Sequence, residues 1–247
     1  MKERIAEASP RLKARIAGVL CLLDGVAAPF AEFFVRAKLV VYGDAAATAT
    51  NILAHEPLYR MGASAWLIAL TCDAAVALIF YDLFKPVSKS LSLLAAFFRL
   101  MFVAVMAANS LNYFAPLILL GGASSLTAFK TDQLQALTLV SHRLFNTGYD
   151  ISMVFWGFHI ILIGWLIFRS AFLPRILGAL LAIGALCYLT NSFADFLAPT
   201  FGDALGIYII VTGAAAELLL TLWLLVMGVD AQRWKEQASA AGASICT

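Results

Sequence analysis

Charged residues are scarce in this sequence, and it has no long polar stretch. Only 13% of its 247 residues are charged and 62% are hydrophobic, whereas soluble proteins carry roughly 25% charged residues. A soluble chain of this length has too little interior to hide so many apolar side chains, and no polar segment is long enough to form a separate domain. The net charge of +2, with basic residues in short clusters, also argues against a nucleic-acid partner. We therefore expect a single domain embedded in a lipid bilayer.

Signatures of common catalytic sites are also missing. The sequence contains no H-E-x-x-H, G-x-S-x-G, Walker loop or dinucleotide fingerprint. Its four cysteines lack C-x-x-C spacing, which indicates small buried side chains rather than metal or redox ligands. His142 and His159 lie more than about 25 Å apart if one helix carries both, so they cannot share a metal ion. We expect no metal and no cofactor. An enzyme is disfavoured, although carboxylates alone can perform acid–base chemistry without a motif.

Six apolar runs are long enough to cross a bilayer, which takes about 20 residues in a helix. The sequence therefore predicts an all-α transmembrane bundle over residues 16–229, preceded by a cytoplasmic segment 1–15 and followed by a cytoplasmic tail 230–247 whose composition predicts disorder. The expected spans are residues 16–35, 58–83, 91–120, 148–168, 176–197 and 204–229.

The distribution of basic residues predicts the orientation of this bundle. Placing the N-terminus inside puts eleven Lys and Arg residues in the cytoplasm and five outside, with Arg99 inside a span. Short cytoplasmic loops carry an excess of Lys and Arg. Both termini are therefore expected in the cytoplasm.

Two outer connections carry helix-start signals. Asp44 precedes a run of good helix formers that ends near Leu53, so a short helix capped by Asp44 is expected. Asp132 and Gln135 have the spacing of a capping box. A helix is expected to start there and to continue through His142 into the fourth span.

Five ionisable residues fall inside the predicted spans, most of them about 14 to 18 Å from the cytoplasmic helix ends. Such residues are costly in a membrane and need a partner or a watery space. One interpretation is structural, with Arg99 neutralising Asp24 or Asp73. The other is a proton or cation site, because the carboxylates outnumber the arginine, with His159 as a relay or as a packing residue. The five residues are Asp24, Asp73, Arg99, His159 and Glu217.

A second polar set lies toward the outer ends of the spans. Its spacing along the helices favours a polar vestibule open to the outside. For Glu32 and Arg36, which are four residues apart, we expect a surface ion pair. The vestibule candidates are Asn109, Asn112, Arg143, Asn146, Asp150, Asn191 and Asp195.

Several segments together resemble a bacterial membrane-protein family catalogued as domain of unknown function (DUF4386). The resemblance implies one multi-span domain in the bacterial cytoplasmic (inner) membrane, and it assigns no activity and no functional residue. The matching segments are Arg15–Gly18, Ala31–Arg36, Gly43–Thr48, Lys85–Leu91, Ala95–Arg99, Phe168–Gly178 and Glu217–Gly228.

Three functions fit these observations. The first is binding or transport of a small solute or ion through the intramembrane carboxylate–arginine cluster. The second is a membrane scaffold or sensory partner that transports nothing, for which the absence of motifs is equally natural. The third is an intramembrane enzyme acting on a lipid, which is disfavoured because an aspartate-rich phosphate-handling motif is missing. The sequence leaves the solute and any protein partner open.

Overall fold

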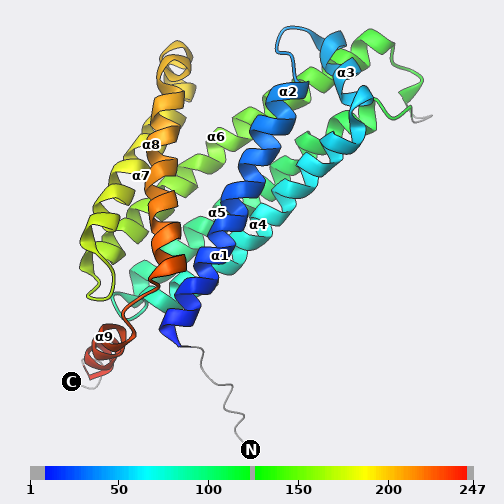
Figure 1. Ribbon diagram of the computed structural model, residues 1–247. Helices are drawn as coiled ribbons and strands as arrows, with labels where there is room; N and C mark the ends of the chain where they lie inside the picture. Colours follow the sequence, from blue (N-terminus) through cyan, green and yellow to red (C-terminus); the bar gives the residue numbers. More distant parts are fainter. Residues whose placement is uncertain (1–8, 123–125, 244–247) are drawn as a thin grey trace, which may run out of the picture. The chain divides into compact units, whose positions relative to one another are not determined.

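The computed structural model describes residues 9–122 and 126–243, with only the backbone for residues 199–210 and 242–243. Helices make up nearly all of this part of the chain, which contains no strand, and the predicted all-α fold is confirmed. The elements in chain order (Figure 1) are α1 (Pro10–Pro29), the π-helix η1 (Phe30–Arg36), α2 (Ala37–Leu39), α3 (Ala45–Ala54), α4 (Glu56–Phe84), α5 (Lys89–Leu119), α6 (Thr131–Arg169), α7 (Arg175–Leu197), α8 (Pro199–Val226) and α9 (Ala231–Ala243).

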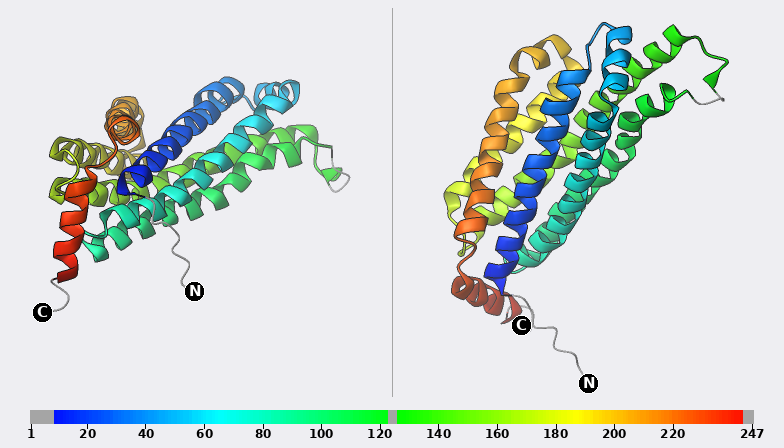
Figure 2. Two further views of the ribbon diagram at one scale, coloured as in Figure 1. Left: turned by 60° about the horizontal axis from the view of Figure 1, so that its bottom comes forward. Right: turned by 45° about the vertical axis from the view of Figure 1, so that its right-hand side comes forward.

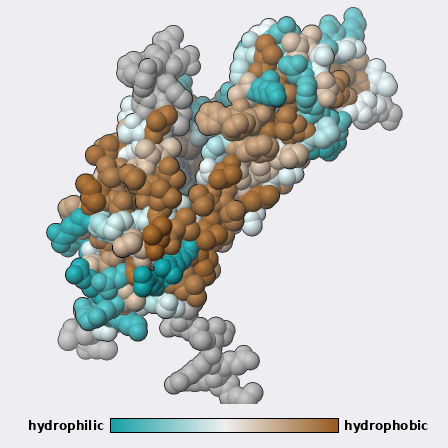
Figure 3. All heavy atoms as spheres, in the orientation of Figure 1, coloured by the Kyte–Doolittle hydropathy of each residue, from teal (hydrophilic) through white to brown (hydrophobic). Residues whose placement is uncertain are grey.

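Five helical segments of the described chain are long and apolar enough to cross a membrane. They are Pro10–Leu39, which joins α1, η1 and α2, and the helices α4, α5, α6 and α7. A sixth is reached if Val211–Val226 and Ala231–Ala241, bent by 101° to each other, count as one span. Figure 3 shows apolar residues covering helix flanks and hydrophilic residues gathering at helix ends. This is the pattern of a multi-pass membrane protein, with five or up to six candidate spans where the sequence predicted six.

Helix α3 starts as its sequence predicts. The side chain of Asp44 accepts a hydrogen bond from the backbone N–H of Ala47 at 2.8 Å. This contact satisfies one of the amide groups that a helix leaves unpaired at its first turn.

Helix α6 also runs unbroken through His142, but it starts earlier than predicted. The Gln133 side chain accepts from the backbone N–H of Lys130 at 2.9 Å, so Lys130 is the N-cap and Gln133 the third helical residue. This is half of a capping box. The predicted pairing of Asp132 with Gln135 is wrong, because the helix has already begun before Asp132.

The C-terminal tail contains an ordered helix, so the expected disorder is wrong for residues 231–243. Asp230 caps α9 by accepting from the N–H of Arg233 at 3.1 Å, and the Trp234 indole donates to the Leu83 carbonyl at 2.8 Å. These contacts supply the partners that composition alone did not reveal.

Of the predicted N-terminal segment, residues 10–15 already belong to α1. Residues 1–8 and 244–247 lie outside the described chain.

Contacts divide the chain into two compact units. Unit 1 comprises Met1–Leu22, Asp73–Phe102 and Met153–Thr247, and unit 2 comprises Leu23–Cys72 and Val103–Ser152. Helices α1, α4, α5 and α6 each contribute a segment to both units. Helices α7, α8 and α9 belong to unit 1, whereas η1, α2 and α3 belong to unit 2.

In unit 1, glycines let α7 and α8 lie side by side (Figures 1 and 2). A Cβ atom on Gly184 would come within 3.1 Å of Gly213 Cα, and one on Gly213 within 2.4 Å of the Tyr188 ring. A side chain at Gly213 would therefore displace the Tyr188 ring. The Tyr188 ring is therefore held against the α8 backbone one turn before Glu217.

In unit 2, the first span changes its winding at a proline. Pro29 is the last residue of α1 and stands directly before the seven-residue π-helix η1. Proline lacks the N–H that an α-helix needs at an interior position. Pro29 therefore explains why the α-helix gives way to a π-helix at this point. The π-helix carries both Glu32 and Arg36, and π-helical turns frequently occur at functional sites.

Candidate functional site

Arg99 of α5 is the centre of a buried cluster in unit 1. Its Nε donates to Asp73 Oδ1 of α4 at 3.1 Å, and its Nη2 donates to the same oxygen. On its other side, Nη1 lies 3.1 Å from His159 Nε2 of α6. The exposed fractions are 3% for Arg99, 2% for Asp73 and 0% for His159. Arg99 thus pairs with one of the two carboxylates that the sequence proposed for it.

The bonds of His159 define its role in this cluster. Its Nδ1 lies 2.8 Å from the Ala95 carbonyl, so that nitrogen carries the proton and Nε2 accepts from Arg99. Both ring nitrogens are occupied. The arrangement corresponds to the packing interpretation of His159 more closely than to a relay, because a relay needs a nitrogen that can exchange its proton.

Aromatic rings enclose the guanidinium of Arg99. Its Cζ lies 4.8 Å from the centroid of Trp156 and 5.6 Å from that of Phe80. The Phe80 ring also stacks on His159 at 6.5 Å. A cation over an aromatic face is stabilised by the ring quadrupole, and more so where water is excluded.

Glu217 of α8 joins this cluster through two neutral donors. The Trp156 indole donates to Glu217 Oε1 at 3.0 Å, and the Tyr188 hydroxyl is a second hydrogen-bond partner. Glu217 is close enough to interact electrostatically with both Arg99 and Asp73. The described cluster therefore holds two carboxylates around one guanidinium.

Four of the five predicted intramembrane residues thus meet in unit 1. The fifth, Asp24, is half-buried on α1 and belongs to unit 2. Sequence spacing placed all five at similar depths. Depth alone does not determine which helix faces meet.

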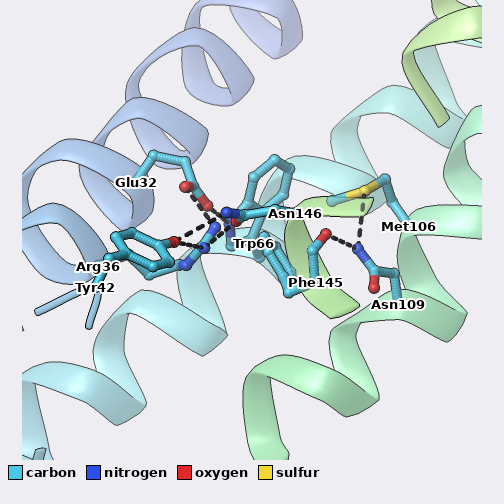
Figure 4. A network of polar contacts seen from close by, with 8 residues as sticks. All are labelled: Glu32, Arg36, Tyr42, Trp66, Met106, Asn109, Phe145 and Asn146. Carbon is cyan, nitrogen blue, oxygen red and sulfur yellow. Dashed lines mark hydrogen bonds and ion pairs between the residues drawn. The ribbon is translucent and has the colours of Figure 1, made fainter. Parts of the chain in front are cut away.

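A second polar network, drawn in Figure 4, ties four segments of unit 2 together. Arg36 Nη1 donates to Glu32 Oε2 at 2.7 Å, and its Nη2 donates to the Tyr42 hydroxyl at 3.2 Å and to Asn146 Oδ1. Asn146 donates in turn to Tyr42 at 3.0 Å, and the Trp66 indole donates to Glu32 Oε1 at 2.9 Å. Both carboxylate oxygens of Glu32 are therefore bonded.

The expected ion pair between Glu32 and Arg36 forms, but the expectation that it lies on the surface is wrong. Arg36 is only 5% exposed, and its Cζ lies 4.3 Å from the centroid of the Phe145 ring. The first apolar segment extends to Leu39, so Arg36 lies inside it rather than just beyond its end. A signal of this was available in the sequence. Phe33 and Phe34 stand between the two charged residues, and these apolar side chains indicate that the membrane-embedded segment continues past Glu32.

The predicted vestibule residues are divided between the units. In unit 2, Asn146 belongs to the Arg36 network, and Asn109 donates to the Phe145 carbonyl at 2.8 Å and accepts from Asn112 at 3.0 Å. Asn191 donates to Asp195 at 2.8 Å in unit 1. The other two unit 2 members are Arg143, which is exposed, and Asp150, which is half-buried.

Metal-ligand clusters and pockets are the two other kinds of site that the described chain could contain. No three His, Cys, Asp or Glu side chains gather closely enough to hold a metal ion in residues 9–122 and 126–243. A pocket of about 270 Å³ lies in unit 2, where Leu53, Pro116 and Leu117 form part of its wall and Glu56 and Arg60 add an exposed ion pair. None of the predicted site residues lines this pocket.

Comparisons with known proteins extend the structural result. A family model described as a domain of unknown function (DUF4386) matches residues 16–228. An uncharacterized protein of Archaeoglobus fulgidus is 27% identical over 161 residues, which cover 65% of this chain and 80% of that protein. This relative is archaeal, so it does not support the bacterial origin that the resemblance implied. No solved structure matches the chain. The chain belongs to the DUF4386 family.

Proposed function

We propose that this protein binds and transports a small ion across a prokaryotic cytoplasmic membrane through the carboxylates of unit 1, with both termini in the cytoplasm. The proton is the simplest ion that fits. The observation that carries the proposal is the charge balance of the cluster, in which Asp73 is paired with the one guanidinium and a second carboxylate, Glu217, lies within electrostatic reach of it.

The chemistry of Glu217 supports a proton or cation site. Its hydrogen-bond donors, the Trp156 indole and the Tyr188 hydroxyl, are neutral, and they orient the carboxylate without cancelling its charge. Excess negative charge within a membrane is costly, and it marks ion pathways and proton relays in membrane proteins. Binding of one proton or one monovalent cation makes the described cluster neutral.

Flux measurements on reconstituted protein test this proposal. Full-length protein is placed in liposomes containing a pH-sensitive dye, and a potassium gradient with valinomycin drives proton entry. We expect the wild type to acidify the lumen and Glu217→Gln to fall to the rate of protein-free liposomes. Glu236→Gln, which alters an exposed carboxylate on α9, is the matched control. A Glu217→Gln protein that transports at the wild-type rate would disprove the assignment.

A second candidate is a scaffold that transports nothing, and a specific observation favours it. Asp73, Arg99 and His159 bond to one another and are almost fully buried, as expected for charges that only orient helices. A scaffold predicts that liposomes with wild-type protein stay as tight as empty ones. It further predicts that the infrared difference spectrum between acid and neutral pH is the same for the wild type and for Glu217→Gln, because Glu217 then takes up no proton.

A further inference from the structure

Three buried polar side chains of unit 2 carry atoms that no group of the described chain pairs with. They are both ring nitrogens of His142, the hydroxyl of Tyr113 and Nε of Arg36. The exposed fractions of these residues are 0%, 1% and 5%. Buried polar groups are nearly always bonded to protein or to ordered water, so each exception needs a cause.

A series of aromatic ring contacts links the three side chains. The His142 ring meets Tyr59 edge-on at 6.0 Å, and Tyr113 lies 4.9 Å from Tyr59 and 5.5 Å from Phe145. Arg36 lies over the Phe145 ring at 4.3 Å. The unpaired atoms come from three different helices of unit 2, and Arg36 lies close enough to interact electrostatically with both Tyr113 and His142.

The chain around these side chains does supply partners to other polar groups. The Tyr59 hydroxyl donates to the Tyr113 carbonyl at 2.7 Å. A Cβ atom on Gly62 would lie 2.3 Å from the Tyr113 hydroxyl, so the glycine is what leaves room for that group. The Tyr59 hydroxyl therefore has a partner in the chain, whereas the ring nitrogens of His142 and the hydroxyl of Tyr113 have none.

We propose that unit 2 contains a buried hydration site, in which one or more water molecules bond to His142, Tyr113 and Nε of Arg36. The charge of Arg36 is matched by Glu32, so the site requires a neutral ligand rather than an ion. Water can accept from the guanidinium and the hydroxyl, and it can both donate to and accept from a neutral imidazole. Internal waters typically make about three hydrogen bonds to groups of this kind.

The three histidines of the chain provide the test. His55 is exposed, whereas His142 and His159 are both 0% exposed but differ in their bonding. Both nitrogens of His159 have partners, and neither nitrogen of His142 has one. Radiolytic hydroxyl-radical labelling read by mass spectrometry marks side chains that lie beside bulk or bound water. The full-length protein would be labelled in lipid nanodiscs.

We expect His142 to be oxidised at a rate nearer to that of His55 than to that of His159. Tyr113 should likewise be labelled faster than Tyr59, which is equally buried but bonded to a carbonyl. Equal rates for His142 and His159, whether both slow or both fast, would overturn the proposal. Slow rates would mean a dry site, and fast rates would mean general opening.

A variant tests whether one site serves both side chains. Tyr113→Phe keeps the ring and removes the hydroxyl, so we expect slower labelling of His142 and an unchanged rate at His159, which also shows that the fold is intact. An unchanged rate at His142 in this variant would overturn a shared site. The proposal concerns unit 2 alone and does not depend on ion transport through unit 1.

Discussion

Units 1 and 2 use the same components with different charge balance. Each buries an arginine against an aromatic ring, and in each a tryptophan indole donates to a glutamate, Trp156 to Glu217 and Trp66 to Glu32. In unit 2 that glutamate is also the partner of the arginine, so the pair is neutral. In unit 1 the arginine pairs with Asp73 and the tryptophan holds a further carboxylate. Charge balance therefore distinguishes the two sites more than residue type does.

The units also differ in their basic residues. The five Lys and Arg residues that the predicted topology places outside all belong to unit 2, and the described ones that it places inside all belong to unit 1. This agreement would hold whichever way the chain faces the membrane, so the orientation itself needs a test. The division gives a reason to test the orientation on one residue from each unit.

The largest expected effect is therefore all-or-none labelling of single cysteines. In a background without native cysteines, Thr131→Cys at the exposed start of α6 should react with an impermeant maleimide on intact spheroplasts. Ser90→Cys, equally exposed near the start of α5, should react only after lysis, because its loop is rich in basic residues. Labelling of Ser90→Cys on intact spheroplasts would contradict the predicted orientation.

Removing the arginine of each unit should lower the free energy of unfolding by different amounts. Arg99→Met leaves Asp73, whose side chain is 3% exposed, without its partner, and breaking such a buried pair costs about 3 to 5 kcal/mol. Arg36→Met should cost less, about 1.5 to 3 kcal/mol, because Glu32 is 28% exposed and keeps Trp66. Unfolding in mixed micelles measures both free energies.

A double variant controls for lost packing. Adding Asp73→Asn to Arg99→Met removes the stranded charge, so the double variant should be more stable than Arg99→Met alone. If it is no more stable, the ion pair is not what holds Arg99 in place. A loss for Arg36→Met that equals the loss for Arg99→Met would remove the distinction between the units.

The smallest effects should come from the two tryptophans. Trp156→Phe and Trp66→Phe each remove a single N–H donated to a carboxylate, so each loss should lie near the lower end of the range for such a bond, at about 1.5 kcal/mol. We expect similar losses of stability, because each glutamate keeps a second partner, Tyr188 for Glu217 and Arg36 for Glu32. Only Trp156→Phe should also change the pH dependence of proton flux. An equal change in both variants would mean that the flux does not pass through unit 1.

Local signals predicted the helices well. Apolar runs long enough for a bilayer marked the spans, and Asp44 marked the start of α3. The error in the C-terminal tail came where a contact distant in sequence decides the outcome. The tail forms a helix whose Trp234 bonds to the Leu83 carbonyl, a partner 151 positions earlier. The start of α6 is set by Gln133 and Lys130 rather than by the stronger-looking Asp132.

By itself, the sequence determined that this chain is a multi-pass membrane protein and that Arg99 needs a carboxylate. Both follow from free energies of transfer into lipid, which depend on residue type and on position along a helix. Only the tertiary structure decided which carboxylate is used and that Arg36 is buried. Those outcomes depend on the rotation and winding of each helix, and the hydrophobicity of a lipid-embedded helix does not encode them. The π-helical turn after Pro29 and the close approach at Gly213 are therefore what place Glu32 and Tyr188 within their sites.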